Sequence, residues 1–243
     1  MPREWKARQK QFQSLKEKIE SCERCPRLRR HCLNVAKKKK REFQTEPYWG
    51  LPVPGFGDLK AKIWIVGLAP AAHGANRTGR IFTGDSSGNW LYRGLYQAGF
   101  SNQALSTHRE DGLSLEGVFV SCAGRCAPPE NKPTTKELQR CSVFLNEEWH
   151  LLKEVQIFLA LGRIAYGAVL HLLRSEGIAI PSPTATFGHG KWHRFGPYTV
   201  VTSYHPSRQN TQTGRLTEPM WQSIFDDLAK WRDKETSGNP TLK

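Results

Sequence analysis

Four short, mostly continuous apolar runs constrain the fold of this 243-residue chain more than any other feature. They lie at 62–67, 116–122, 155–161 and 198–203. Strands that are apolar throughout are typical of parallel sheets whose two faces are both covered. Segments with helical spacing separate or follow the runs, at 87–98, 134–150, 163–175 and 217–234. This alternation predicts an α/β fold with a mainly parallel sheet and helices on both sides.

The charge of the chain is strongly basic and unevenly distributed. The net charge is +14, and residues 1–43 hold 15 Lys or Arg against 5 Glu, with a peak at "KKKKR" (37–41). Such an excess favours a polyanionic partner, because each neutralised phosphate releases a counterion. The alternative for the peak itself is a solvated, partly disordered basic arm. No apolar run reaches 18 residues and the first residues lack a secretion signal, so we expect a cytoplasmic chain without membrane contact.

The N-terminal segment differs from the rest in composition. Apolar positions with helical spacing predict a helix over 4–20, and a cysteine-bearing loop and the basic run follow it. We therefore expect residues 1–45 to form a basic helix followed by a cysteine-bearing segment that binds a metal cluster, as argued next. This segment is expected to belong to the same domain as an α/β core at 46–234. Residues 235–243, "ETSGNPTLK", are expected to be a disordered tail.

Six cysteines in a cytoplasmic chain argue against disulfides and for another use. Cys22 and Cys25 form a C-x2-C pair, and Cys126 and Cys141 form a second, more widely spaced pair. Two such pairs could together hold one tetrahedral centre, either zinc or an iron–sulfur cluster. The alternative is a set of ordinary buried thiols. Cys122 ends a predicted strand and is interpreted as a core residue, and Cys32 as a spare thiol beside the centre.

Three polar or glycine-rich stretches follow predicted strands, at 67–88, 122–133 and 204–216. In open α/β sheets, ligands bind beyond the carboxyl ends of the strands, so these stretches are expected to converge on one cleft. No phosphate-binding loop or dinucleotide fingerprint is present among them, which disfavours a small-nucleotide-binding protein.

The same stretches carry a resemblance to a known family. "GLAPAAHGANRTGRIFTGDSSG" (67–88), "RCAPPENKPTTKELQRC" (125–141) and "TSYHPSRQNTQTGRLT" (202–217) resemble three motifs of the family 5 uracil-DNA glycosylases, in the same order. "ALGRIAYGAVL" (160–170) and "FGHGKWHRF" (187–195) are also similar. The resemblance implies a three-layer α/β/α sandwich around a short parallel sheet, and hydrolysis of the N-glycosidic bond of uracil and other deaminated bases, such as hypoxanthine, in DNA.

It also implies a [4Fe-4S] cluster held by Cys22, Cys25, Cys126 and Cys141, with zinc as the alternative. One position departs from the wider superfamily. Other families carry an acid or amide in the turn after the first strand, whereas Leu68 and Ala69 stand here; family 5 proteins share this absence.

Two residues are the candidates for catalysis. The enzyme must flip the target nucleotide out of the DNA, because its active site cannot reach a base that is stacked in the duplex. Cleavage gives the sugar positive character and the departing base negative charge. His205 is expected to stabilise the base by a hydrogen bond that strengthens as charge builds. Asp85 is expected to position water or to face the sugar cation, and it could also be a helix N-cap.

The remaining candidates concern binding. Phe82 is interpreted as a platform for the extruded base, with a core aromatic as the alternative. Asn131 could read a base edge through its amide. Glycine backbone permits close approach of phosphate and base, and the loop after His205 could enter the DNA and grip phosphates. The full set of predicted base- and DNA-binding residues is Gly67, Ala69, His73, Gly74, Phe82, Gly84, Asn131, Arg208, Gln209 and Asn210.

These features lead to one main hypothesis and one alternative. The main hypothesis is a monomeric, monofunctional glycosylase that acts on single- or double-stranded DNA in a prokaryotic cytoplasm, associated with the nucleoid. A lyase would need a well-placed lysine, and the three motifs contain only Lys132 and Lys136, both in the second. The alternative is a non-catalytic iron–sulfur DNA-binding module, which the apolar turn at Leu68 and Ala69 favours.

Overall fold

The computed structural model describes residues 3–182 and 186–237 and contains one six-stranded sheet. The strand order is β1-β3-β2-β4-β6-β5. The four central strands are parallel, and these are β2 (Ile63–Gly67), β3 (Val118–Cys122), β4 (Ile157–Leu161) and β6 (Tyr198–Ser203). The edge strands β1 (Phe56–Gly57) and β5 (Lys191–Phe195) are antiparallel to their neighbours. The predicted mainly parallel sheet is therefore confirmed, and the two antiparallel edges are additions to it.

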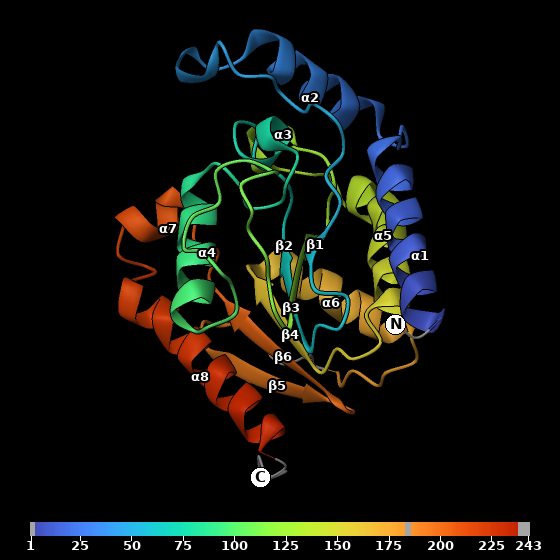
Figure 1. The fold of residues 1–243 in the computed structure, drawn as a ribbon, viewed down its shortest axis with the longest axis vertical. Helices are drawn as coiled ribbons and strands as arrows, with labels where there is room; N and C mark the ends of the chain where they lie inside the picture. The colour runs from blue at the N-terminus through green and yellow to red at the C-terminus, as the bar shows by residue number, and fades with distance from the viewer. Residues whose placement is uncertain (1–2, 183–185, 238–243) are drawn as a thin grey trace.

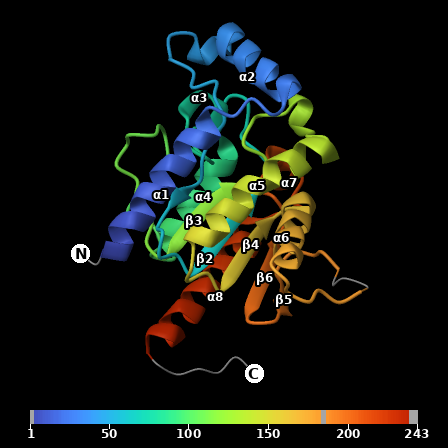
Figure 2. The same ribbon diagram turned by 90° about the vertical axis from the view of Figure 1, so that its right-hand side faces the viewer.

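Helices cover both faces of the sheet, as Figures 1 and 2 show. One face packs against α4 (Ser86–Gln97) and α8 (Glu218–Thr236), and the other against α5 (Thr135–Leu151) and α6 (Arg163–Ser175). The alternation along β2 explains this division, because Ile63 and Ile65 point into the first layer and Trp64 and Val66 into the second. The three-layer α/β/α sandwich is thereby confirmed.

The N-terminal segment docks on the second layer and then crosses the carboxyl ends of the strands. Helix α1 (Arg3–Glu20) packs Leu15 and Ile19 against Phe144 of α5. Helix α2 (Pro26–Lys38) follows where the sequence suggested only a loop. The missed helix has the usual signals: Pro26 in its first turn, apolar Leu28 and Cys32 four residues apart, and lysines in its last turn, where they suit the helix dipole.

The basic run at 37–41 has a defined conformation. It contains the end of α2 and the first residue of a 3-10 helix, Arg41–Phe43. Lys39 adopts a positive φ of 54° and donates its backbone N–H to Val35, which closes the helix, and its Nζ donates to the Glu46 carbonyl at 2.6 Å. These contacts oppose the disordered interpretation of the arm. The predicted tail begins inside α8, and residues 238–243 lie outside the described residues.

No helix among residues 3–182 and 186–237 has the combination of length and apolar character that a bilayer crossing requires. Two further short helices, α3 (Ala75–Thr78) and α7 (Arg208–Gln212), follow β2 and β6. They lie at the carboxyl end of the sheet, near the end of the molecule that α2 forms (Figure 1). This end therefore gathers the predicted motifs.

Candidate active site

The carboxyl ends of β2 and β3 form the floor of the site. Gly67 pairs with Cys122 in the parallel register, and the backbone contact continues past the strands, where Ala123 and Gly124 donate to the carbonyls of Gly67 and Leu68. Ala69 lies beside Gly124 in this turn. A Cβ on Gly67 would come within 2.7 Å of the Phe82 ring and 2.9 Å of the Cys122 sulfur. Glycine is therefore required at the end of β2, because an aromatic ring closes directly over its backbone.

The segment 79–85 has an unusual backbone conformation, most clearly at Phe82. Phe82 has a φ of 51°, which is costly for a bulky residue and persists only where the surroundings impose it. Its ring is 6% exposed and stacks against the His205 imidazole, with centroids 5.9 Å apart. Phe82 thus packs in the core and stacks on His205, and its role as a platform for the base stays a prediction.

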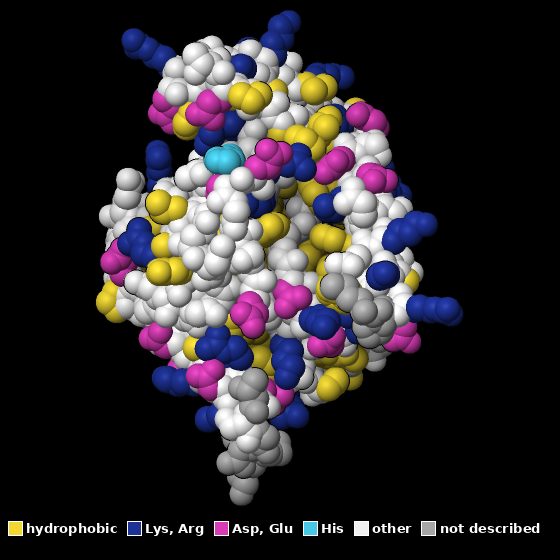
Figure 3. Space-filling model, in the orientation of Figure 1, with side chains coloured by type: hydrophobic (Ala, Val, Ile, Leu, Met, Phe, Trp, Pro, Cys, Tyr) yellow, Lys and Arg dark blue, Asp and Glu magenta, His cyan; other side chains and the backbone are white. Residues whose placement is uncertain are grey.

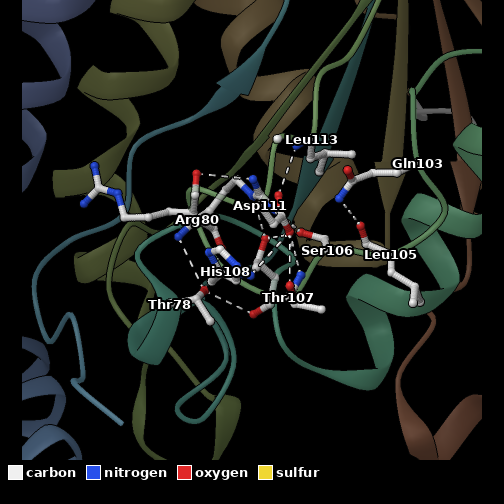
Figure 4. A network of polar contacts seen from close by, with 12 residues as sticks. Thr78, Arg80, Gln103, Leu105, Ser106, Thr107, His108, Asp111 and Leu113 are labelled. Carbon is white, nitrogen blue, oxygen red and sulfur yellow. Dashed lines mark hydrogen bonds and ion pairs between the residues drawn. The ribbon is translucent and has the colours of Figure 1, made fainter.

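A buried polar network imposes the conformation of this segment (Figure 4). The Arg80 guanidinium donates to Ser106 and Asp111 at 2.7 Å each and to Thr83 at 3.0 Å. The Ser106 carbonyl accepts from the Gly84 N–H at 3.0 Å. Arg80 and Asp111 are 4% and 7% exposed, so the ion pair is shielded from water. The network joins the loop at 101–115 to the residues that precede Asp85.

Asp85 is the N-cap of α4, as one interpretation of its position predicted. Its Oδ1 accepts from the Gly88 N–H at 2.9 Å. Its Oδ2 lies directly over Gly74, where a Cβ would come within 2.0 Å of this oxygen. Burial raises the pKa of the carboxyl, against the lowering effects of the Gly88 and Ser87 N–H groups and of the Arg77 and Arg208 cations. One carboxylate oxygen is thus used by the helix and the other faces the glycine-rich turn.

Arg77 connects Asp85 to the basic N-terminal segment, and sequence reasoning gave this residue no role. Its Nε donates to the His73 carbonyl at 2.8 Å and its Nη2 to the Gly84 carbonyl at 2.9 Å. It also pairs with Glu46, and its guanidinium lies 3.9 Å from the centroid of the Phe43 ring.

His73 belongs to the same contact region. Its Nδ1 lies 2.9 Å from the Tyr48 hydroxyl, and burial lowers its pKa. Gly84, with a φ of 77°, leaves no room for a side chain, because a Cβ would meet the Arg77 guanidinium at 2.4 Å. The predicted binding residues of the first motif therefore do lie together, although His73 and Gly84 act here through contacts within the protein.

His205 follows β6 and approaches the same floor. Burial lowers the pKa of its imidazole to about 4, so the ring is neutral at physiological pH. Within residues 3–182 and 186–237 no hydrogen bond engages its ring nitrogens. The Asn210 amide donates to the His205 carbonyl at 2.8 Å and fixes the turn. The imidazole is thus held from its backbone while its N–H remains available.

The segment after His205 is a helix rather than an extended loop. Ser207 caps α7 by accepting from the Asn210 N–H. The Asn210 side-chain amide donates to the His205 carbonyl, and its contact with DNA stays a prediction. Arg208 and Gln209 are exposed on this helix. Lys40 has the largest lowering effect on the pKa of Glu42, and Arg208 and Arg77 lower it further. Arg208 on α7 therefore lies near Glu42, at the end of the basic segment. Figure 3 shows a notch between that end and the body, with basic side chains projecting from the end itself.

One other predicted contact, Asn131, is not brought into this group. Asn131 is exposed in a 3-10 turn (Pro129–Asn131) with a φ of 57°. Its amide makes no hydrogen bond within the described residues, so its role in reading a base stays a prediction. His189 lies against Ser203, Tyr204 and the Met220 carbonyl, where it joins β6 to α8.

The four predicted cysteine ligands line one cavity. Cys22 and Cys25 come from the segment between α1 and α2, Cys126 from the loop after β3, and Cys141 from α5. Burial raises the pKa of Cys25, and raises that of Cys141 to about 11. No group of three or more His, Cys, Asp or Glu in the described parts of the chain converges closely enough to hold a single metal ion. Cys32 hydrogen-bonds Cys126, and Cys122 is 1% exposed in the core, as predicted for each.

Comparison with known proteins agrees with this geometry. The family model of the uracil DNA glycosylase superfamily matches residues 54–229. The chain belongs to this superfamily. The type-5 uracil-DNA glycosylase of Thermus thermophilus is 48% identical over 208 residues, which cover 85% of this chain and 92% of the relative. That of Mycobacterium tuberculosis is 44% identical over 214 residues, 87% of this chain and 78% of the relative. The type-4 enzyme of Pyrobaculum aerophilum is 30% identical over 163 residues, 67% of this chain and 66% of the relative.

The superfamily match covers the strands, the cleft residues and two of the four cysteines. It begins after Cys22, Cys25 and the basic run, so the N-terminal segment stands outside the matched region. The alignments with type-5 relatives span more of the chain than the alignment with the type-4 relative. Membership in the superfamily and resemblance to its type-5 members, both expected from the motifs, are therefore confirmed.

Proposed function

We propose that this chain is a monofunctional DNA glycosylase that removes uracil by hydrolysing the N-glycosidic bond and leaves an abasic site. One observation carries the proposal: the start of α4 and the turn after β6 hold a partly buried aspartate and a neutral, partly buried histidine beyond the carboxyl ends of the strands, in a chain of the uracil DNA glycosylase superfamily. All groups invoked come from one chain, so the reaction requires only a monomer. Its substrate places it with chromosomal DNA, in the cytoplasm and at the nucleoid.

The neutral imidazole of His205 acts on the leaving base. As the glycosidic bond breaks, negative charge builds on the base oxygen that faces the ring. A neutral N–H donor stabilises this charge by a strengthening hydrogen bond without giving up its proton. An imidazolium would be costly in the same place, because burial already disfavours the charged ring.

Asp85 acts on the other side of the breaking bond. Its Oδ1 is fixed by the Gly88 N–H, which leaves Oδ2 over Gly74 to hold the attacking water and to face the cationic sugar. The absence of an acid at Leu68 and Ala69 is compatible with this chemistry, since the carboxylate arrives from the start of α4 instead. The proposal therefore answers the alternative of a non-catalytic module.

The substrate range is proposed to extend beyond uracil. Cys122 stands at the end of β3 beneath the site, and a thiol is a weak hydrogen-bonding group that reads base edges poorly. A pocket with few strict donors and acceptors tolerates hypoxanthine and other deaminated bases. We propose that the basic N-terminal segment and Arg208 hold the DNA backbone on the two sides of the notch.

A [4Fe-4S] cluster is proposed for the cysteine cavity. The donor set fits, because Cys22, Cys25, Cys126 and Cys141 all face one cavity while no three of them converge as ligands of a single ion do. This spacing favours a cluster over the zinc alternative. The bound cluster would supply a covalent link between the N-terminal segment and α5, and no step of the hydrolysis passes through it.

The activity is tested by base release. Purified protein is expected to release free uracil from a uracil-containing oligonucleotide, and the abasic strand is expected to stay intact until alkali is added. The same assay with hypoxanthine, in single- and double-stranded DNA, measures the proposed wider range. Strand scission by the clean protein would contradict monofunctional hydrolysis, and no release of any base would contradict the proposal itself.

The pH dependence follows from the two pKa shifts. The rate is expected to be flat around neutrality, because His205 stays neutral above about pH 4. It is expected to fall in acid as Asp85 takes up a proton, beginning at a higher pH than for an exposed aspartate, because burial raises its pKa. An acid limb at the ordinary imidazole pKa of about 6.5 that persists in the residual activity of Asp85→Asn would show that His205 titrates, and would contradict the assignment.

A further inference from the structure

Arg125 is a buried arginine that the proposed hydrolysis does not use. It immediately precedes Cys126 and lines the same cavity as the four cysteines. Its side chain is 2% exposed, and its Nη2 donates to Glu148 Oε2 at 2.6 Å. Its Nε and Nη1 are also buried, and neither has a hydrogen-bond partner in the part of the chain that the structure describes. A guanidinium that served only to neutralise Glu148 would leave two donors without water or protein acceptor.

The surroundings indicate which acceptor is missing. Cys141 and Glu148 are seven residues apart on α5, so the helix presents a cysteine and the counter-ion of Arg125 on one face. The Arg125 backbone N–H lowers the pKa of the Cys141 thiol as a hydrogen-bond partner, against the larger effect of burial. The sulfurs that share the cavity with Arg125 are therefore the candidate acceptors, since thiolate sulfurs bound to iron carry negative charge.

The other cavity arginines have partners or are open to water. Arg24 donates to the Arg140 carbonyl, Arg29 donates to the Gly50 carbonyl at 2.9 Å, and Arg140 donates to the Arg24 carbonyl and also hydrogen-bonds the Cys25 thiol. Arg24 and Arg140 are exposed to water. Arg125 differs from them in having two buried donors without a partner among the described residues.

We propose that Arg125 donates hydrogen bonds from Nε and Nη1 to the sulfurs of the cysteine-bound cluster, and thereby retains the cluster and raises its reduction potential. The inference rests on the proposed cluster. Reduction adds negative charge to the sulfurs, so donors aimed at them stabilise the reduced state more than the oxidised state. Glu148 holds the guanidinium in place, as outer partners of metal ligands commonly do.

The test compares variants that separate hydrogen bonding from charge. Arg125→Met/Glu148→Leu removes both ions, so the net charge is unchanged and the buried pair is replaced by apolar volume, a change that proteins often tolerate. Arg125→Lys keeps the ion pair and loses the forked donors. Arg24→Gln is the control, since it alters an exposed arginine at the same cavity that donates to the Arg140 carbonyl.

Iron and acid-labile sulfide per chain, the reduction potential and the rate of cluster loss to a chelator are measured on purified full-length protein. We expect the double variant and Arg125→Lys to show a more negative potential and about 10- to 100-fold faster loss, with Arg24→Gln like the wild type. If the wild-type protein holds the cluster and both Arg125 variants keep its potential and its rate of cluster loss, the inference about Arg125 is overturned and the proposed cluster stands. A wild-type protein without iron and sulfide would overturn the proposed cluster and the inference together, while uracil release would still report on the hydrolysis.

Discussion

Asp85→Asn and His205→Ala are each expected to lower kcat for uracil release by at least about 100-fold, the usual effect of removing a group that acts in the transition state. Asparagine is also a good N-cap, so the first change keeps the acceptor for the Gly88 N–H and removes only the charge. The second change removes the neutral donor and leaves its backbone turn, which Asn210 holds. Single-turnover rates on a uracil-containing duplex measure both effects.

Two controls separate catalysis from folding and binding. Asn89→Ala alters an exposed position on α4 one turn beyond Asp85 and is expected to leave the rate unchanged. DNA affinity and thermal unfolding of the two catalytic variants are expected to stay close to those of the wild type. If wild-type turnover were no faster than that of the Asp85→Asn/His205→Ala double variant, the chain would be a DNA-binding module and not an enzyme.

The sheet could be predicted from the sequence because its four parallel strands are buried on both faces. Each of the apolar runs coincides with a strand to within two residues. Strand β5 could not be found in this way, because Lys191, Trp192 and Arg194 are exposed and give no apolar alternation. Its conformation comes from pairing with β6, which is a tertiary interaction. Helix α2 was missed for another reason: its cysteines and cations suggested a metal loop, although Leu28, Cys32 and Val35 have helical spacing.

The residues of the candidate site were also predictable from the sequence only in part. Asp85, His205 and the four cysteines could be selected because motif residues at strand ends and paired cysteines carry local signals. Arg77 and Arg125 received no role, because a buried arginine is recognised by its partners and not by its neighbours in sequence. Phe82 was selected as a platform from its residue type, whereas its positive φ and its packing over Gly67 follow only from the network around Arg80.

Asp111→Ala is expected to lower the free energy of unfolding by about 3–5 kcal/mol, because it leaves the Arg80 guanidinium buried without its counter-ion. The two side chains are 31 residues apart in sequence and tie the loop at 101–115 to the Phe82 segment (Figure 4). Asp227→Ala is the matched control, since Asp227 pairs with Lys230 at 3.1 Å on the surface, where about 0–1 kcal/mol is expected. Equal effects of the two changes in urea unfolding would show that the buried pair has no special role.

The pH dependence of stability gives an independent check on the same pair. Burial raises the pKa of Asp111, but hydrogen bonds from Arg80 and from the Thr107 and Leu113 N–H groups outweigh it and lower the pKa to about 2. A carboxyl whose folded pKa is depressed stabilises the protein above its unfolded pKa, about 3.9, and loses that contribution as the pH falls through its folded value. Wild-type stability is therefore expected to fall more steeply than that of Asp111→Ala between about pH 4 and pH 2. Because the same network sets the backbone of Phe82, which packs on His205, uracil release by Asp111→Ala is expected to decline at temperatures where the variant is still folded.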